Sequence, residues 1–232
     1  MRSETSITSN FRWPGIICLA SLLVGGCQSA ALVEPLGTLP TVPLEITDKE
    51  LGNDVLVFGR VRWIQNGEER NDYRSAYGWN IWPEYYRLDD GRNGTLAVAE
   101  DGTFAWQLPT GTYLAYQLRW FDTWDGPHRL PLRMAFRVPE AKHAYCVGTI
   151  IAKLEAKRDL IGGLWIKDWD LVLDDTCETD RQWFASRYAD LTIPAKKSLL
   201  VYEPAIPESI EALEKRDAIA DLLRVLYPRF LQ

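Results

Sequence analysis

Residues 95–121 read TLAVAEDGTFAWQLPTGTYLAYQLRWF, and this stretch decides the predicted fold. Large apolar side chains alternate with smaller or polar ones after Asp101-Gly102, a pair typical of a tight β-hairpin turn. A second turn is predicted at Pro109-Thr110-Gly111, and a further strand covers 113–121. Three strands joined by short turns form an antiparallel meander. The stretch therefore predicts a protein built mainly from antiparallel β-strands.

The two turns of this stretch resemble those of a known family. Residues 102–113 (GTFAWQLPTGTY) follow the pattern G-x-F-x-x-x-L-P-x-G-x-Y, which resembles a hairpin of carboxypeptidase-regulatory-like and related transthyretin-like β-sandwich modules. These modules are structural or binding appendages of bacterial surface proteins and have no catalytic residues of their own. The resemblance implies a mainly β fold, an antiparallel β-sandwich of transthyretin-like or Ig-like type, with a role that is not catalytic.

Period-two alternation predicts further strands on either side of the meander. In residues 55–63, Arg60 and Arg62 alternate with apolar side chains, and Asn66-Gly67 follows as a turn. The same pattern predicts strands at 132–138, 143–152, 164–173 and 198–202. The segments between them are predicted as a long aromatic connection at 68–93, a polar loop at 122–131 and a charged bend at 155–159.

Strands 143–152 and 164–173 are expected to pair around a turn at Ile161-Gly162. If the turn is centred between these two residues, the numbers of facing residues sum to about 323. Cys146 then faces position 177, which is also a cysteine. Antiparallel pairing brings the two Cα atoms near the ~5.5 Å that a disulfide needs. We therefore predict a Cys146–Cys177 disulfide, which requires an oxidising compartment.

The N-terminal stretch predicts export. Arg2 and Arg12 precede an uncharged apolar run that is shorter than the roughly 20 residues of a permanent membrane span. The run ends in Leu23-Val-Gly-Gly-Cys27, which resembles the bacterial lipobox, although Val24 stands where that family prefers Leu. The resemblance implies cleavage before Cys27 and acylation of Cys27. Because Gln28 follows rather than an aspartate, it also implies the outer membrane, with the folded part facing the periplasm.

A buried helix of the fold is the alternative interpretation of this apolar run. Pro14, Gly25 and Gly26 disfavour such a helix, because proline and glycine are the two weakest helix formers. The predicted organisation is a signal peptide at 1–26, a lipidated N-terminus and tether at 27–52, a β-sandwich domain at 53–177 and a helical extension packed on it at 178–232. For part of the tether, an edge strand around 44–46 that lies along the domain is the alternative.

One or two C-terminal helices are predicted in that extension. Aromatic side chains recur at helical spacing in 178–190, with Thr176 or Thr179 as the N-cap. A second helix is predicted from Pro207, where an apolar stripe begins, to Pro228, where it ends.

Charge limits the classes of partner. The 232-residue chain has 26 Lys and Arg against 32 Asp and Glu, a formal net charge of −6. Loss of the leader makes the chain one unit more negative, since Arg2, Arg12 and Glu4 leave with it. An acidic chain without a basic stripe is a poor electrostatic partner for nucleic acid. We expect no nucleic-acid partner, and contact with the membrane through the lipid anchor.

Candidate metal-ligating and catalytic residues are few. His143 and Cys146 are close in sequence, and His128 and Cys177 are the other soft ligands. On a strand, an odd spacing points two side chains to opposite faces, so a disulfide with two ordinary histidines is favoured over a metal site. Two histidines and no Gly-x-Ser-x-Gly turn give little support to a nucleophilic triad. We therefore predict no metal, no cofactor and no catalytic residue.

Aromatic residues near 122–131 suggest a ligand site. Trp120, Asp122, Trp124 and Asp125 place rings that stack on sugar faces beside carboxylates that accept hydrogen bonds from hydroxyls. Trp124 is expected to be the most exposed ring. Core packing is the favoured alternative for the aromatic residues of the long connection, Trp79, Trp82, Tyr85 and Tyr86.

Two classes of function remain. We favour a non-catalytic envelope lipoprotein that binds an envelope protein or a glycan. The second class is a polysaccharide hydrolase, whose paired carboxylates would come from Asp122, Asp125 and Asp170. A glycosidase places two such groups roughly 5 to 9.5 Å apart. Dispersed positions of the three carboxylates would therefore exclude the hydrolase.

Overall fold

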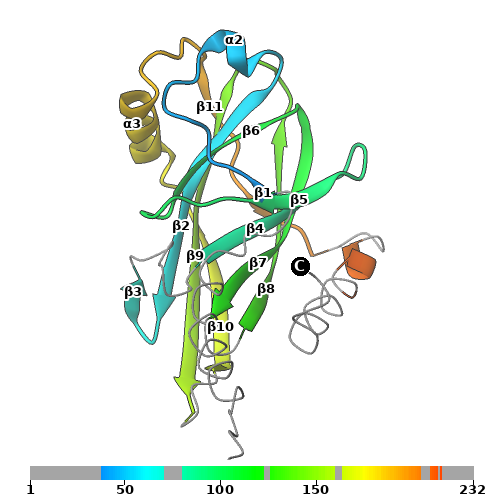
Figure 1. The fold of residues 1–232 in the computed structure, drawn as a ribbon, viewed down its shortest axis with the longest axis vertical. Coiled ribbons are helices and arrows are strands. Elements are labelled where there is room, and N and C mark those ends of the chain that lie inside the picture. Colours follow the sequence, from blue (N-terminus) through cyan, green and yellow to red (C-terminus); the bar gives the residue numbers. More distant parts are fainter. Residues whose placement is uncertain are drawn as a thin grey trace, which may run out of the picture.

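The computed structural model describes residues 38–70, 80–122, 126–159, 164–204, 210–213 and 215. Strands form most of this chain and pack as two sheets, which confirms the predicted mainly β, sandwich-like fold (Figure 1). The strands are β1 (Thr38–Leu39), β2 (Val55–Gln65), β3 (Glu68–Arg70), β4 (Asn80–Arg87), β5 (Asn93–Leu96), β6 (Thr103–Leu108), β7 (Gly111–Asp122), β8 (Gly126–Val138), β9 (Ala144–Arg158), β10 (Leu164–Asp174), β11 (Ala195–Lys197) and β12 (Val201–Tyr202). The helices are α2 (Asp48–Leu51) and α3 (Cys177–Arg187).

Each sheet combines strands from distant parts of the chain. Sheet A has the order β1-β5-β4-β7-β8-β12. Sheet B has the order β10-β9-β2-β3, with β6 also paired to β2 and β11 also paired to β9. The pairs β1–β5, β2–β9 and β11–β9 are parallel. Both sheets are therefore mixed rather than purely antiparallel.

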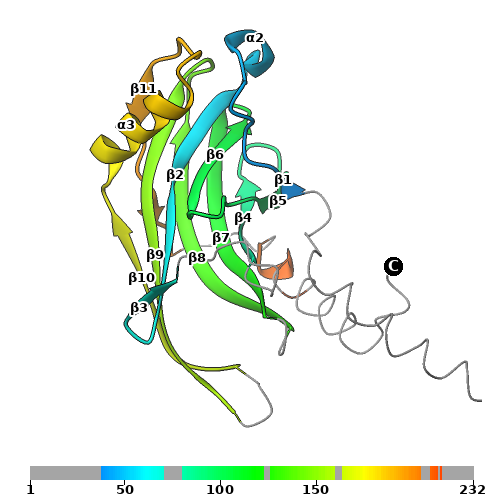
Figure 2. The same cartoon turned by 60° about the vertical axis from the view of Figure 1, so that its left-hand side comes forward.

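The parallel pair β2 and β9 forms the centre of sheet B. Residues 55–59 and 144–152 are buried without interruption. Continuous buried runs of this kind are typical of strands covered on both faces. One face of the pair packs into the space between the sheets, and the other lies under α3 and residues 42–51 (Figure 2).

The main core lies between the two sheets. Trp63 of β2 and Trp120 of β7 are fully buried, and their rings meet edge to face with centroids 4.9 Å apart. On β6, the rings of Phe104 and Trp106 are stacked at 3.7 Å, and the Trp106 indole donates to the Ala97 carbonyl over 2.6 Å. Buried aromatic rings contribute large apolar areas, so these contacts hold the sheets together.

A second core covers the outer face of sheet B. Phe58 of β2 stacks on Phe184 of α3 with ring centroids 4.3 Å apart, and Val42 packs in the same cluster. The Tyr188 hydroxyl donates to the Val42 carbonyl over 3.1 Å. Residues 38–51, which the sequence analysis assigned to the tether, are thus packed on the sandwich. The leader, Cys27 and the remainder of the tether up to residue 37 lie outside the described residues.

The predicted meander is wrong about strand partners. The turn at Asp101-Gly102 is present, and the Ala99 N–H donates to the Thr103 carbonyl over 2.8 Å. β5 before the turn pairs with β4 in sheet A, however, whereas β6 after it pairs with β2 in sheet B. The chain then returns to sheet A in β7. Turn residues specify a local reversal, but packing against distant segments decides which sheet each strand joins.

Segment 68–93 contains strands that the sequence analysis missed. β3 forms a hairpin with β2 across the predicted Asn66-Gly67 turn, and β4 is an interior strand of sheet A. Proline is disfavoured in such a strand because it has no N–H to donate. Within β4, β5 pairs only with residues 84–86, so among the described strands Pro83 is paired with β7 alone. The missing proline N–H therefore costs no hydrogen bond to a second described strand.

Two other segments that were predicted as connections between strands, a loop and a bend, also belong largely to strands. Most of the loop predicted at 122–131 belongs to β8, which is paired with β7 from Gly126 onward. β9 continues through the predicted bend at 155–159 as far as Arg158. Beyond the end of β2, β9 and β10 form a projecting two-stranded ribbon (Figure 2). The side-chain amide of Asn66 holds its base through two 2.9 Å hydrogen bonds to the backbone of Ala156.

The predicted pairing of β9 with β10 is confirmed in register. After an irregularity at Lys167, Trp169 lies opposite Leu154. Cys146 and Cys177 form the predicted disulfide, with Cα atoms 5.6 Å apart. Cys177 is the first residue of α3, so the bond ties this helix to the central strand β9.

α3 confirms the first predicted C-terminal helix. Thr176 is the N-cap residue, and its hydroxyl donates to Asp180 over 2.5 Å. In the second predicted helix, residues 210–213 and 215 are helical, and Ile210 packs against Leu114 and Tyr116 on the outer face of sheet A. Among the described residues, no helix is long and apolar enough to cross a membrane.

Removal of the disulfide should destabilise the fold. The double variant Cys146→Ala/Cys177→Ala should lose about 4 kcal/mol in free energy of unfolding, because the bond closes a loop with a sequence separation of 31. Urea titrations of the variant and of the oxidised wild type measure the difference. Identical unfolding midpoints would contradict this prediction.

A side chain at position 148 is expected to destabilise the fold. Gly148 has φ 85° in a bulge of β9, and a Cβ there would meet the Asp174 carbonyl oxygen at 2.7 Å. Gly67 has a similar φ of 83° but nothing within 4 Å, so it is the matched control for backbone strain alone. Gly148→Ala should lower the free energy of unfolding by about 1–3 kcal/mol more than Gly67→Ala does. Equal losses in urea titrations would show that the close approach is absent.

Candidate functional site

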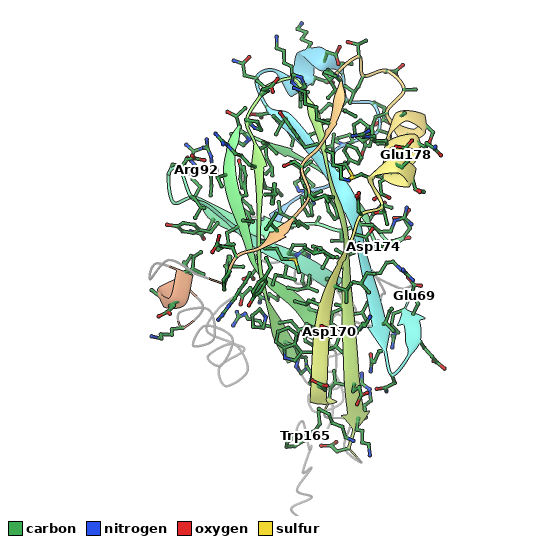
Figure 3. All side chains as sticks on the ribbon, turned by 180° about the vertical axis from the view of Figure 1, so that it is seen from behind. Glu69, Arg92, Trp165, Asp170, Asp174 and Glu178 are labelled. Atoms are coloured by element: carbon green, nitrogen blue, oxygen red, sulfur yellow. A yellow bond between two sulfur atoms is a disulfide. The ribbon has the colours of Figure 1, made fainter. Side chains whose placement is uncertain are left out.

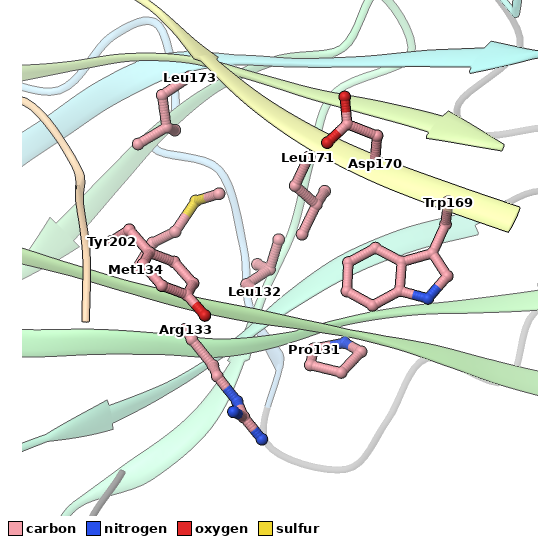
Figure 4. A pocket seen from close by; sticks show the side chains of 9 residues that line it. All are labelled: Pro131, Leu132, Arg133, Met134, Trp169, Asp170, Leu171, Leu173 and Tyr202. Atoms are coloured by element: carbon pink, nitrogen blue, oxygen red, sulfur yellow. The ribbon is translucent and has the colours of Figure 1, made fainter. Parts of the chain in front are cut away.

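An apolar groove of about 670 Å³ lies at one side of the sandwich. Edge strand β10 of sheet B faces β8 and β12 of sheet A there, and we call the space between them the β8–β10 groove (Figure 4). Apolar side chains of β8 and β10 form its floor, and an aromatic residue flanks each side. The floor consists of Leu132, Met134, Leu171 and Leu173, and the flanking residues are Trp169 and Tyr202.

A bulge in β8 shapes one wall of the groove. The pairing of β8 with β7 shifts register between Ala115 and Gln117, and Arg133 has φ 52°. Bulges near sheet edges redirect side chains. β12 continues sheet A beside the bulge, with Tyr202 opposite Met134, and the Glu203 N–H donates to the Arg133 carbonyl over 2.8 Å. The bulge and β12 together bring Arg133 and Tyr202 to the groove.

The inward face of β10 forms the other wall. Trp169, Leu171 and Leu173 alternate on this face, and the two leucines pack on the main core. Trp169 is 42% exposed. Its indole reaches from β10 toward Pro131 of β8 (Figure 4). The opposite face of β10 carries three carboxylates, those of Asp168, Asp170 and Asp174.

Exposed apolar side chains gather beside this groove. Six large apolar residues of the described chain are classed as exposed, and four of them lie on β10 and β12. These four are Trp165, Trp169, Val201 and Tyr202. Figure 3 shows Trp165 on the ribbon at the end of β10, with Asp170 farther along the same strand. Trp169 and Tyr202 line the groove, whereas Trp165 lies farther along β10, outside its lining. Exposed aromatic side chains beside an apolar hollow commonly mark a binding site, so the groove is the candidate site.

Trp120, a predicted ligand residue, lies in the core instead. Its ring is fully buried and is stacked on His128 with centroids 4.9 Å apart, so it cannot stack on a sugar. Tyr116 is an extra residue in β7 relative to β4. The alternation along β7 therefore shifts by one residue after Tyr116, so that Trp120 faces the core between the sheets. Asp122 ends β7, but its side chain is not described, and Trp124 and Asp125 lie outside the described residues.

The residues weighed as metal ligands do not form a centre in the described part of the chain. Cys146 and Cys177 are in the disulfide, so neither offers a thiolate. His143 Nε2 is 3.5 Å from a carboxylate oxygen of Glu140. A 2.7 Å hydrogen bond from Lys196 lowers the pKa of Glu140. No group of three or more His, Cys, Asp or Glu residues within the described ranges is placed to hold a metal ion.

A buried polar cluster lies between β4 and β7. Glu84 is 4% exposed and accepts hydrogen bonds from the Tyr116 hydroxyl over 3.1 Å and from the Gln117 amide. Its other carboxylate oxygen is 3.5 Å from Arg119 Nη1. A buried carboxylate is tolerated when paired and hydrogen-bonded in this way, so the cluster fixes β4 against β7.

Trp169 and Tyr202 are site residues that the sequence analysis did not select. Alternation along 164–173 predicted a strand there, and β10 confirms it. The alternation did not show that the inward face opens to solvent at this edge. The available signal was the predicted helix after residue 177, because a strand that runs into a helix is not covered at its second edge by a hairpin partner that directly follows it.

Comparison with known proteins identifies no family. No family model matches the chain, and no curated protein matches it. Among solved structures, the crystal structure of 3-chlorocatechol 1,2-dioxygenase from Rhodococcus opacus matches with a TM-score of 0.20 and 9% sequence identity, over 85% of this chain and 72% of that chain. A likeness this weak carries no argument about fold or function.

Trp169 should contribute little to stability, unlike the buried tryptophans. Trp169→Ala should change the free energy of unfolding by less than about 1 kcal/mol, since its ring is 42% exposed. Trp120→Ala, which removes a fully buried ring, should cost about 3–5 kcal/mol. Urea titration followed by far-UV circular dichroism compares the two. A loss for Trp169→Ala as large as that for Trp120→Ala would show that Trp169 is a core residue.

Proposed function

We propose that this protein is a lipid-anchored envelope lipoprotein, held at the bacterial outer membrane with its β-sandwich facing the periplasm. The sandwich acts as a non-catalytic binding module, and the β8–β10 groove is its binding surface. The observation that carries the proposal is the exposed pair Trp169 and Tyr202 on either side of an apolar floor.

The cysteines support export and anchoring. Cys146 and Cys177 are bonded to each other, and stable disulfides are typical of proteins outside the cytosol. Cys27 follows the lipobox-like residues 23–26 and provides the position for acylation. Several buried acyl chains at about 0.8 kcal/mol per CH₂ anchor a protein to a membrane stably.

The shape of the groove supports binding rather than burial of another part of the sandwich. Leu171 and Leu173 already pack on the main core, which holds the floor of the groove in place. Trp169 and Tyr202, by contrast, expose 42% and 60% of their surface. Large aromatic side chains at the rim of an apolar hollow are frequent anchors of binding partners.

A glycan is the second candidate ligand. Trp169 and Tyr202 both line the groove and are exposed. An indole and a tyrosine hydroxyl suit a sugar, whose apolar face stacks on the indole ring and whose hydroxyls exchange hydrogen bonds with the tyrosine. This combination favours a polar saccharide over a purely apolar ligand.

The anchor is tested at Cys27. Mass spectrometry of protein from membrane fractions should find an N-terminal peptide that begins at Cys27 and carries two or three acyl chains. Cys27→Ser should remove the modification and release the protein from the membrane fraction, whereas Cys18→Ser, within the leader, should leave both unchanged. An intact leader on the wild-type protein would overturn the lipoprotein proposal.

A further inference from the structure

The outer edge of β10 is an unpaired strand edge beside the β8–β10 groove. β10 pairs along its length with β9 and, within the described residues, with no strand on its other side. On the facing wall, β12 pairs only with Ala135 and Met134 of β8. The backbone N–H and C=O groups of such an edge form a template for another strand. The Trp169 N–H donates to the Asp168 carboxylate over 2.9 Å, and an added strand takes the place of this local hydrogen bond. The geometry therefore favours an extended chain as the occupant of the groove.

We propose that the groove binds an extended polypeptide segment that adds to the edge of β10, with apolar and basic side chains in alternation. The proposal deepens the proposed function and rests on it, because it takes the same groove as the binding surface. Strand addition of this kind derives affinity from main-chain hydrogen bonds and specificity from alternate side chains.

The inward face of β10 sets the apolar half of the pattern. Trp169, Leu171 and Leu173 occupy every second position on this face. In an added strand, the residues opposite them point to the same side, toward Leu132 and Met134 of β8. Valine, isoleucine or leucine at those positions buries apolar surface on the floor of the groove.

The outward face of β10 sets the basic half. Asp168 lies directly opposite Glu155 of β9, and both are exposed. Like charges directly opposite each other destabilise a pair of strands. Asp170 lies opposite Lys153, whereas Asp168 lies opposite a second carboxylate. A Lys or Arg of the added strand, facing Asp168, adds a positive charge at this pair of carboxylates.

A second copy of this chain fits the edge poorly. In a two-fold antiparallel pairing, the residue at the axis faces its own copy. The β10 residues that line the groove run from Trp169 to Leu173. An axis at Trp169 places Asp168 opposite Asp170, an axis at Asp170 places that carboxylate opposite itself, and an axis at Leu171 places Asp168 opposite Asp174. Each of these registers opposes like charges.

The experiment measures peptide binding to the mature lipoprotein in detergent micelles. The probe is a short fluorescent peptide in which Val alternates with Lys, compared with the same composition in non-alternating order and with a Val–Glu peptide. The alternating basic peptide should bind at least about tenfold more tightly than either of the other two, a difference of about 1.4 kcal/mol. Trp169→Ala should weaken its binding.

Reversing the charge at position 168 distinguishes a binding role from a structural one, because a loss of stability alone would not change which peptide is preferred. Asp168→Lys should reverse the preference in favour of the Val–Glu peptide. Asp190→Lys, at an exposed position after α3, is the matched control and should preserve the wild-type order. Hydrogen exchange of the β10 amides should slow only when the alternating basic peptide is bound.

Four outcomes would overturn the proposal. These are equal binding of the alternating and non-alternating peptides, binding of none of the peptides, an unchanged preference in Asp168→Lys, and binding of a chitooligosaccharide instead, lost in Trp169→Ala. In the last case the groove remains the binding surface and only the peptide is excluded. Unmodified Cys27 would overturn the anchor alone, because the peptide assay does not depend on acylation.

Discussion

The parallel pairing of β2 with β9, buried on both faces, is the constraint on which the rest of the structure depends. Both faces of these strands carry apolar side chains, so each face must be covered. Sheet A covers the inner face, and other elements cover the outer one. α3 and residues 42–51 supply that outer cover, and the stacked rings of Phe58 and Phe184 join α3 to β2. Cys146 and Cys177 make this arrangement covalent.

The same arrangement explains why the groove is open. From β9 and β10 the chain continues into α3, which is drawn to the outer face by the disulfide and by the second core. No described strand therefore follows β10 at the edge of sheet B. The short β12 adds only Val201 and Tyr202 to the edge of β8. The side of the sandwich between these two edges is left with exposed aromatic rings and, at β10, a strand edge that no described strand covers.

Much of the fold could be predicted from local patterns, because periodicity and turns are local properties. Alternation identified β2, β7, β9 and β10, and the register around Ile161-Gly162 predicted the disulfide. Strand partners depend instead on packing between distant residues. The sequence therefore predicts a hairpin at Asp101-Gly102, where the chain in fact passes from sheet A to sheet B. Bulges are a further limit: the extra residue Tyr116 reverses the alternation in β7 and buries Trp120. The site at Trp169 depends on which strand ends a sheet, and the alternation within that strand does not contain this information.

The account claims above all that the β8–β10 groove is where this protein meets its partner. Site-specific photo-cross-linking in living cells tests the claim directly, with benzoyl-phenylalanine in place of Trp169 or Tyr202. Leu88, in the turn after β4, is 43% exposed and serves as the control position away from the groove. The account predicts a discrete adduct from both groove positions and none from position 88. Adducts of equal yield from all three positions, or from position 88 alone, would contradict it.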